Sequence, residues 1–125
     1  MAEQKGALSG ALTAATTTAG GDALGLANPE GADVIITRLI LDITTEATGV
    51  ATVDAGIAAA ATTSADDLID EGDVGSAAIV LNSGKHAGTH GLHCLKWGSA
   101  QYLTVTPSAT LAGLVGNYYV EYVRE

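Results

Sequence analysis

Apolar and polar residues alternate along residues 32–45 (ADVIITRLILDITT), the densest run of branched apolar side chains in the chain. Period-two alternation in a segment rich in β-branched residues predicts a long β-strand with one face in a hydrophobic core. The core face is expected to hold Thr37 together with Ile35, Leu39, Leu41 and Ile43. The opposite face is expected to hold Arg38, Asp42 and Thr44 beside Ile36 and Ile40. A helix would instead scatter the apolar residues around its circumference.

Shorter alternating runs, separated by glycine, asparagine or proline turns, predict further strands. They are residues 50–57 (VATVDAGI), 101–106 (QYLTVT) and 118–124 (YYVEYVR), together with the short apolar run at residues 77–81 (AAIVL). The clearest turn is residues 28–31 (NPEG), because proline presets φ at the second position and glycine leaves the turn without a side-chain penalty. A hairpin is predicted from residues 12–18 and 23–27 around residues 20–22 (GGD). One helical turn is predicted over residues 66–70.

Several short strands at roughly even spacing predict an all-β fold, a two-sheet β-sandwich of the jelly-roll kind. Residues 1–18 are expected to form an extended N-terminal arm or a first edge strand, and residues 19–125 a single β-sandwich domain. Leu8 and Leu12 are the apolar residues with which the arm would contact a neighbouring subunit. The last strand is apolar on both faces, so Tyr119 and Val123 are also expected to contact a partner.

The composition limits the classes of partner. The chain has 125 residues and a net charge of −9, with only five Lys and Arg. Binding to nucleic acid or to an anionic membrane needs clustered basic side chains, so neither is an expected partner. Much of the 47% hydrophobic fraction is alanine, which buries less area than larger side chains. Contacts between subunits are therefore expected to supply part of the burial that stabilises the domain.

One group of potential metal ligands lies between residues 86 and 94. Its members are His86, His90, His93 and Cys94. Imidazole and thiolate are zinc ligands, but this spacing matches no recognised zinc pattern. The favoured interpretation is a solvated loop without a metal or cofactor, and a metal-stapled domain is the alternative.

Five carboxylates form a second group within residues 66–73: Asp66, Asp67, Asp70, Glu71 and Asp73. Their spacing does not fit an EF-hand loop, in which oxygen ligands alternate and a glutamate closes the site at position twelve. A solvated acidic face is the favoured interpretation, and a weak cation site that links subunits is the alternative.

No sequence pattern favours an enzyme. The chain has no Gly-x-Ser-x-Gly motif, and its glycine-rich segment GDALGL lacks the lysine of a phosphate-binding loop. Trp97 is the single tryptophan in a chain without phenylalanine, which favours a role as the largest core side chain. The alternative is a stacking platform for carbohydrate. Burial of the indole distinguishes these interpretations.

Two long segments resemble a known class of protein. Residues 36–70 (ITRLILDITTEATGVATVDAGIAAAATTSADDLID) and 96–125 (KWGSAQYLTVTPSATLAGLVGNYYVEYVRE) are similar to small head-associated decoration, or cement, proteins of tailed bacteriophages. The similarity covers about residues 32–125. Its strongest features are TVDAG at residues 52–56, DDLID at 66–70, KW at 96–97 and the closing YVEY at 119–122.

This resemblance implies a β-sandwich or jelly roll on the outer surface of the capsid, often as a homotrimer, that bridges capsomers. The implied partner is the major capsid protein, and the chain would be made in the host cytoplasm. An N-terminal arm reaching a neighbouring subunit is common in the family, and residues 1–18 would be that arm here. Alternatives are a tail, neck or head-fibre base component and, from another class, a carbohydrate- or cell-surface-binding module.

Overall fold

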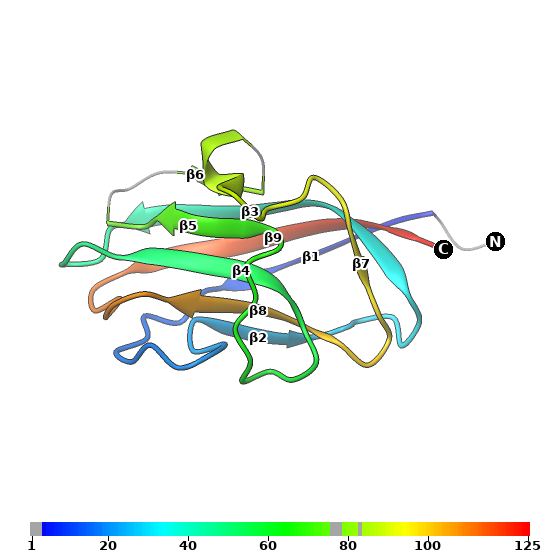
Figure 1. Cartoon of the computed structure of the whole chain (residues 1–125), viewed down its shortest axis with the longest axis horizontal. Coiled ribbons are helices and arrows are strands. Elements are labelled where there is room, and N and C mark those ends of the chain that lie inside the picture. Colours follow the sequence, from blue (N-terminus) through cyan, green and yellow to red (C-terminus); the bar gives the residue numbers. More distant parts are fainter. Residues whose placement is uncertain (1–3, 76–78, 83) are drawn as a thin grey trace.

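The computed structural model describes residues 4–75, 79–82 and 84–125, which form two antiparallel β-sheets packed face to face (Figure 1). Sheet A has the strand order β1-β9-β3-β6, with β7 also paired to β3, and sheet B has the order β2-β8-β4-β5. The elements are β1 (Lys5–Ala11), β2 (Leu24–Ala27), β3 (Val34–Thr45), β4 (Thr52–Ala58), β5 (Ile69–Asp73), β6 (Ile79–Leu81), the 3₁₀ helix η1 (Gly84–Ala87), β7 (Leu95–Trp97), β8 (Tyr102–Pro107) and β9 (Val115–Arg124). The predicted all-β two-sheet sandwich is confirmed.

The N-terminal segment is part of sheet A. Strand β1 runs antiparallel to β9 at the edge of the sheet, with Lys5 opposite Val123 and Ala11 opposite Asn117. Residues 1–3 of the predicted arm lie outside the described residues. The hairpin predicted from residues 12–18 and 23–27 is wrong, because β2 pairs with β8 and the chain crosses between the sheets at this point.

Two glycines of β1 lie directly opposite two tyrosines of β9. Gly6 lies opposite Tyr122 and Gly10 opposite Tyr118, and both tyrosines are buried. A Cβ atom at Gly6 would overlap the Tyr122 ring, and one at Gly10 would lie 2.8 Å from Tyr118 Oη. Each ring therefore covers the backbone of β1 where a side chain is missing, as aromatic residues do over glycines in edge strands.

Strand β3 is the long strand predicted from residues 32–45, but its core face changes phase. A β-bulge between Ile36 and Arg38 places one extra residue, Thr37, in β3 relative to β9. The buried residues are therefore Val34, Ile36, Leu39, Leu41 and Ile43. The assignment of Ile35 and Thr37 to the core face and of Ile36 to the opposite face was wrong: Thr37 is exposed, and an extra residue exchanges the two faces on one side of the bulge.

The segment before β5 is extended and not helical. Leu68 and Ile69 are fully buried, and the Leu68 amide donates to the Ala55 carbonyl at 2.9 Å. The helical turn predicted over residues 66–70 is therefore wrong: β-pairing with β4 satisfies the backbone here. In β4, the predicted inward residues Val53, Ala55 and Ile57 are buried as expected.

The alanine-rich segment after β4 forms a loop over the outer face of sheet B, where it crosses the nearer strands in Figure 1. Gly25 of β2 and Gly56 of β4 lie on either side of Thr104 of β8 in register. A Cβ atom at Gly25 would lie 3.1 Å from Ala61 Cβ, and one at Gly56 would lie 2.9 Å from Ala65 Cβ. Because two of these three positions lack a side chain, the loop approaches the sheet and leaves Thr104 fully buried.

Candidate interaction surface

The outer face of sheet A remains exposed and combines apolar with polar side chains. In β9 the core residues Tyr118, Val120 and Tyr122 alternate with Tyr119 and Glu121, which are exposed. The apolar residues of this outer face are Ile35, Ile40, Ile79, Val115, Tyr119 and Val123. Ile79, Val115 and Tyr119 are 56%, 54% and 42% exposed, which is high for side chains of this size. Large contiguous apolar patches are typical of protein-contacting surfaces, which makes this face the candidate interaction surface.

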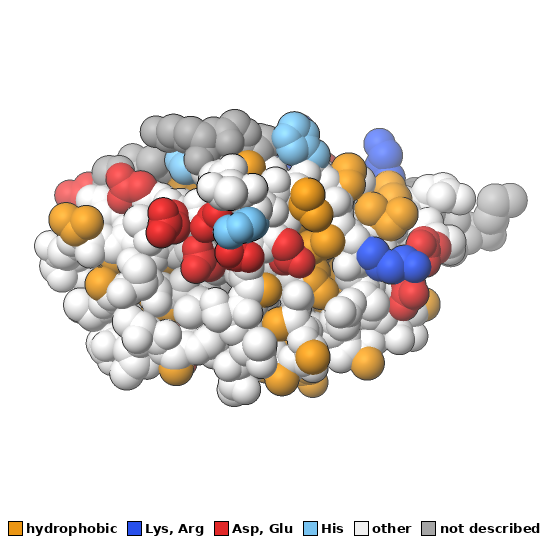
Figure 2. All heavy atoms as spheres, viewed as in Figure 1, with side chains coloured by type: hydrophobic (Ala, Val, Ile, Leu, Met, Phe, Trp, Pro, Cys, Tyr) orange, Lys and Arg blue, Asp and Glu red, His pale blue; other side chains and the backbone are white. Residues whose placement is uncertain are grey.

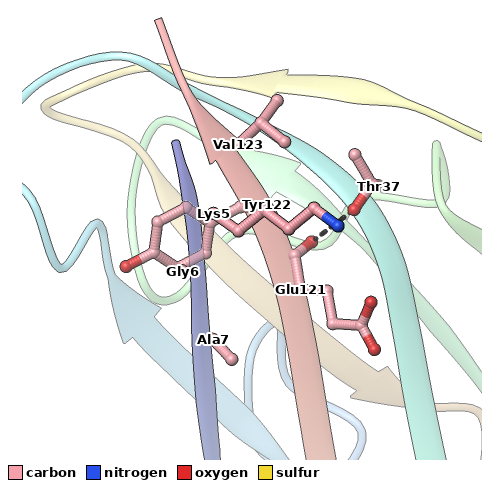
Figure 3. A pocket seen from close by; sticks show the side chains of 7 residues that line it. All are labelled: Lys5, Gly6, Ala7, Thr37, Glu121, Tyr122 and Val123. Carbon is pink, nitrogen blue, oxygen red and sulfur yellow. Dashed lines mark hydrogen bonds between the residues drawn. The ribbon is translucent and has the colours of Figure 1, made fainter. Parts of the chain in front are cut away.

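A groove of about 650 Å³ lies on this sheet beside the edge strand (Figure 3). Its lining residues come from β1, β9 and β3: Lys5, Gly6, Ala7, Thr37, Glu121, Tyr122 and Val123. Thr37 at the β3 bulge donates through Oγ1 to the Glu121 carbonyl at 3.2 Å, and Figure 3 shows Lys5 extending across β9 towards Thr37. Gly6 and Ala7 are the small residues among those that line it, and both belong to the edge strand β1.

A cluster of charged side chains around Arg124 and Glu30 lies at the end of β9, next to the groove. Arg124 donates to Glu30 through Nε at 2.9 Å and through Nη2 at 3.1 Å, and its Nη1 donates to the Lys5 carbonyl at 2.7 Å. Tyr122 Oη donates to Glu30 Oε2 at 2.6 Å. The cluster joins the turn at residues 28–31 to β9 and β1. Hydrogen bonds from Arg124, and then from Tyr122, lower the pKa of Glu30 from 4.5 to about 2.

This pKa shift predicts a defined pH dependence. Glu30 ionises more readily in the folded chain, so its carboxylate stabilises the fold above about pH 4.5, and this contribution disappears as the pH falls to about 2. The urea midpoint of wild type should exceed that of Glu30→Gln above pH 4.5, and the two midpoints should converge below it. High salt should reduce the difference, because the pair lies at the surface. Midpoints that stay equally separated from pH 5 to pH 2 would contradict this assignment.

The four residues predicted to contact partners lie on two different faces. Tyr119 and Val123 belong to the outer face of sheet A, with Val123 partly buried. Leu8 and Leu12 are partly buried and pack against the hydrophobic core. The side of the sheet that Leu8 and Leu12 face was not predictable from the sequence pattern, because it depends on the pairing of β1 with β9.

The candidate ligands of the alternative interpretation, His86, His90, His93 and Cys94, do not form a group of three or more within ligand distance of one another in the described structure. Among the described residues, the donor atoms that lie within 4.8 Å of one another belong instead to Asp66, Asp70 and His90. His90 Nδ1 lies 2.9 Å from Asp66 Oδ2 and 3.1 Å from Asp70 Oδ2. The fold thus joins one member of the histidine group to two members of the acidic group, a combination that the spacing within either group does not reveal.

Several acidic side chains of residues 54–73 accept backbone hydrogen bonds. Asp67 Oδ1 accepts from the Ile57 amide at 3.0 Å, and Asp54 Oδ1 accepts from the Glu71 amide at 2.8 Å. Asp70 Oδ2 accepts from the amides of Thr89 and His90 at 3.1 and 3.2 Å. These carboxylates hold loops against β4 and β5, a structural role that sequence reasoning missed because their donors lie at least ten residues away.

Trp97 is fully buried, and its Nε1 donates to the Gln101 carbonyl at 3.0 Å. The expectation that it is the largest core side chain is confirmed. A buried indole cannot stack on a sugar ring, so a carbohydrate platform built on Trp97 does not fit this structure. Within the described residues, no helix has the length and apolar character needed to cross a membrane.

Comparison with known proteins identifies a shared fold. No protein-family model matches the chain, and no curated protein sequence matches it. A chain in the solved capsid of Ralstonia phage GP4 aligns with 100% of this chain and 87% of its own length, with a TM-score of 0.63 and 21% sequence identity. At this identity the similarity establishes the fold. This sandwich is the fold of a chain found in a phage capsid.

Proposed function

We propose that this protein is a structural component of a bacteriophage virion. The observation that carries the proposal is the full-length match in fold to a chain of the Ralstonia phage GP4 capsid. The similarity of residues 36–70 and 96–125 to phage decoration proteins supports the same class and rests on sequence.

More specifically, the protein decorates the outer surface of the capsid and bridges capsomers through contacts with the major capsid protein, as a homotrimer. The outer face of sheet A is its docking surface. Support comes from the contrast between the sheets: a loop of the chain itself covers the outer face of sheet B, whereas Ile79, Val115 and Tyr119 stay exposed on sheet A. Burying such residues in an assembly stabilises the folded chain by mass action, and several weak contacts per particle combine into avidity.

The test introduces two substitutions into the phage that encodes the chain and quantifies the chain in purified particles by mass spectrometry. Tyr119→Asp places a charge on the docking surface and should reduce incorporation at least tenfold, because an unpaired charge is costly to bury. Val50→Asp is the matched control, since Val50 is 93% exposed in the β3–β4 loop and should tolerate the charge.

Wild-type and Val50→Asp chains should be present in a fixed ratio to the major capsid protein. Absence of the wild-type chain from purified particles would overturn the virion role. Normal incorporation of Tyr119→Asp would overturn the docking surface while leaving the virion role intact. Electron cryo-microscopy of the particles separates an outer capsid position from a tail, neck or head-fibre base position.

A further inference from the structure

A mixed cluster of two carboxylates and one imidazole lies beside β5, the edge strand of sheet B. It consists of Asp66, just before β5, Asp70 within β5, and His90 from the loop between η1 and β7. Figure 2 shows acidic side chains gathered around a histidine over β4 and β5. We call it the Asp66–Asp70–His90 cluster.

Buried and hydrogen-bonded backbone holds both segments of the cluster in place. Leu68 and Ile69, between the two aspartates, are fully buried. The Leu92 amide donates to the Asp67 carbonyl at 2.9 Å, which ties the histidine loop directly to the aspartate segment. Asn82 is buried and donates through Nδ2 to the carbonyls of Leu92 and His93, both at 3.1 Å. The donor groups are therefore positioned by the fold before any ligand binds, which lowers the ordering cost of binding.

The distances suit a shared ion. Ligand atoms about 2.0–2.2 Å from a tetrahedral divalent metal lie roughly 3.3–3.6 Å from each other, so a further separation of a few tenths of an ångström would admit an ion here. His90 Nδ1 is 2.9 Å from Asp66 Oδ2 and 3.1 Å from Asp70 Oδ2. The side chains of His90 and Asp66 are 61% and 46% exposed, so an ion can reach the cluster from solvent.

The charge balance also calls for a cation. Within the described part of the chain, no Lys or Arg forms a salt bridge with Asp66 or Asp70; these bridges join Lys96 to Asp33 and Glu125, and Arg124 to Glu30. The neighbouring carboxylates of Asp54, Asp67 and Glu71 add to the negative field, in a chain whose net charge is −9. The His90 imidazole contacts both carboxylates.

We propose that the Asp66–Asp70–His90 cluster binds one divalent transition-metal ion of the Zn²⁺ class. The ion lies between His90 Nδ1 and the two carboxylate oxygens and replaces their direct contacts with the imidazole. An imidazole nitrogen with two carboxylate oxygens suits Zn²⁺, whereas Ca²⁺ and Mg²⁺ prefer oxygen ligands alone. Three protein ligands leave at least one coordination position for water.

The test is calorimetric titration of Zn²⁺ into chelator-treated full-length protein, with thermal melts at each end point. We expect one ion per chain and a higher Tm with Zn²⁺, and a much smaller response to Mg²⁺. Asp66→Asn and His90→Gln should each weaken Zn²⁺ binding at least tenfold. The His90 side chain is exposed and that of Asp66 is about half exposed. Neither substitution touches Asp70, which accepts the backbone hydrogen bonds from Thr89 and His90.

His93→Gln and Cys94→Ser are the matched controls, because both residues are exposed, lie in the same loop and are outside the cluster. They should bind Zn²⁺ like wild type. No uptake by the wild-type protein, or uptake that survives His90→Gln but disappears with His93→Gln or Cys94→Ser, would overturn the proposal. Circular dichroism of each apo variant checks that the fold is retained.

Discussion

Replacing Trp97 with alanine should lower the free energy of unfolding by about 3–5 kcal/mol, the range for removal of a large aromatic side chain from a core. Trp97 is the largest fully buried side chain and lies in β7 directly opposite Val34 of β3. Since domains of this kind are stable by about 5–15 kcal/mol, the loss is a large share of the total. The expected decrease in Tm is about 10–20 °C.

Urea unfolding followed by far-ultraviolet circular dichroism measures this effect, because the substitution removes the single tryptophan that fluorescence would report. Trp97→Phe is the informative companion. It keeps most of the packing and loses the Nε1 hydrogen bond to the Gln101 carbonyl, so its loss should be well under half of that for alanine. An alanine variant within about 1 kcal/mol of wild type would contradict the placement of Trp97 in the core.

Gly56→Ala should cost about 2–6 kcal/mol although it adds a single methyl group. The new Cβ would overlap Asp67 Oδ1 and would lie 2.9 Å from both Ala65 Cβ and the Asp67 amide nitrogen. Asp67 must move, and the Ile57 amide then loses the carboxylate that it contacts at 3.0 Å. Overpacking costs about 1–3 kcal/mol, and an amide without an acceptor costs a further 1–3 kcal/mol or so.

Gly49→Ala is the matched control for this substitution. No atom lies within 4 Å of a Cβ at Gly49, and its φ is outside the left-handed region. Alanine there should be neutral or slightly stabilising, because it restricts the unfolded chain. Equal urea midpoints for the Gly56→Ala and Gly49→Ala variants would show that the loop after β4 does not press on sheet B.

The strands were predictable where apolar and polar residues alternate along the sequence. Val53, Ala55 and Ile57 alternate in sequence and are buried in β4 as predicted. The faces of β3 were only partly predictable, because a bulge depends on how β3 pairs with β9 and not on residues 34–45 alone. Local signals also failed at residues 66–70, where a capping pattern suggested a helical turn and burial of Leu68 and Ile69 imposed an extended path.

The candidate sites were less predictable than the fold. Tyr119 was identifiable because alternation in the last strand left an apolar residue on its second face. The partnership of His90 with Asp66 was not identifiable, since it depends on the hydrogen bond that joins Leu92 to Asp67 across two loops. The contact of the loop after β4 with Gly25 and Gly56 could not be predicted from the sequence. The two glycines are brought beside Thr104 only by the register of β2, β8 and β4.

The pairing of β1 with β9 has a consequence for biosynthesis. β9 lies between β1 and β3, so the first strand of the chain has no neighbour in sheet A until the last strand is in place. Contacts between the two ends of a sequence form slowly, because a long loop must close first. A nascent chain that lacks β9 would expose the edge of β3 and the core residues beneath it, which is the condition for aggregation. Sheet A therefore assembles only after β9 has left the ribosome, and a chain that stops before β9 should be more sensitive to proteolysis than the full-length chain.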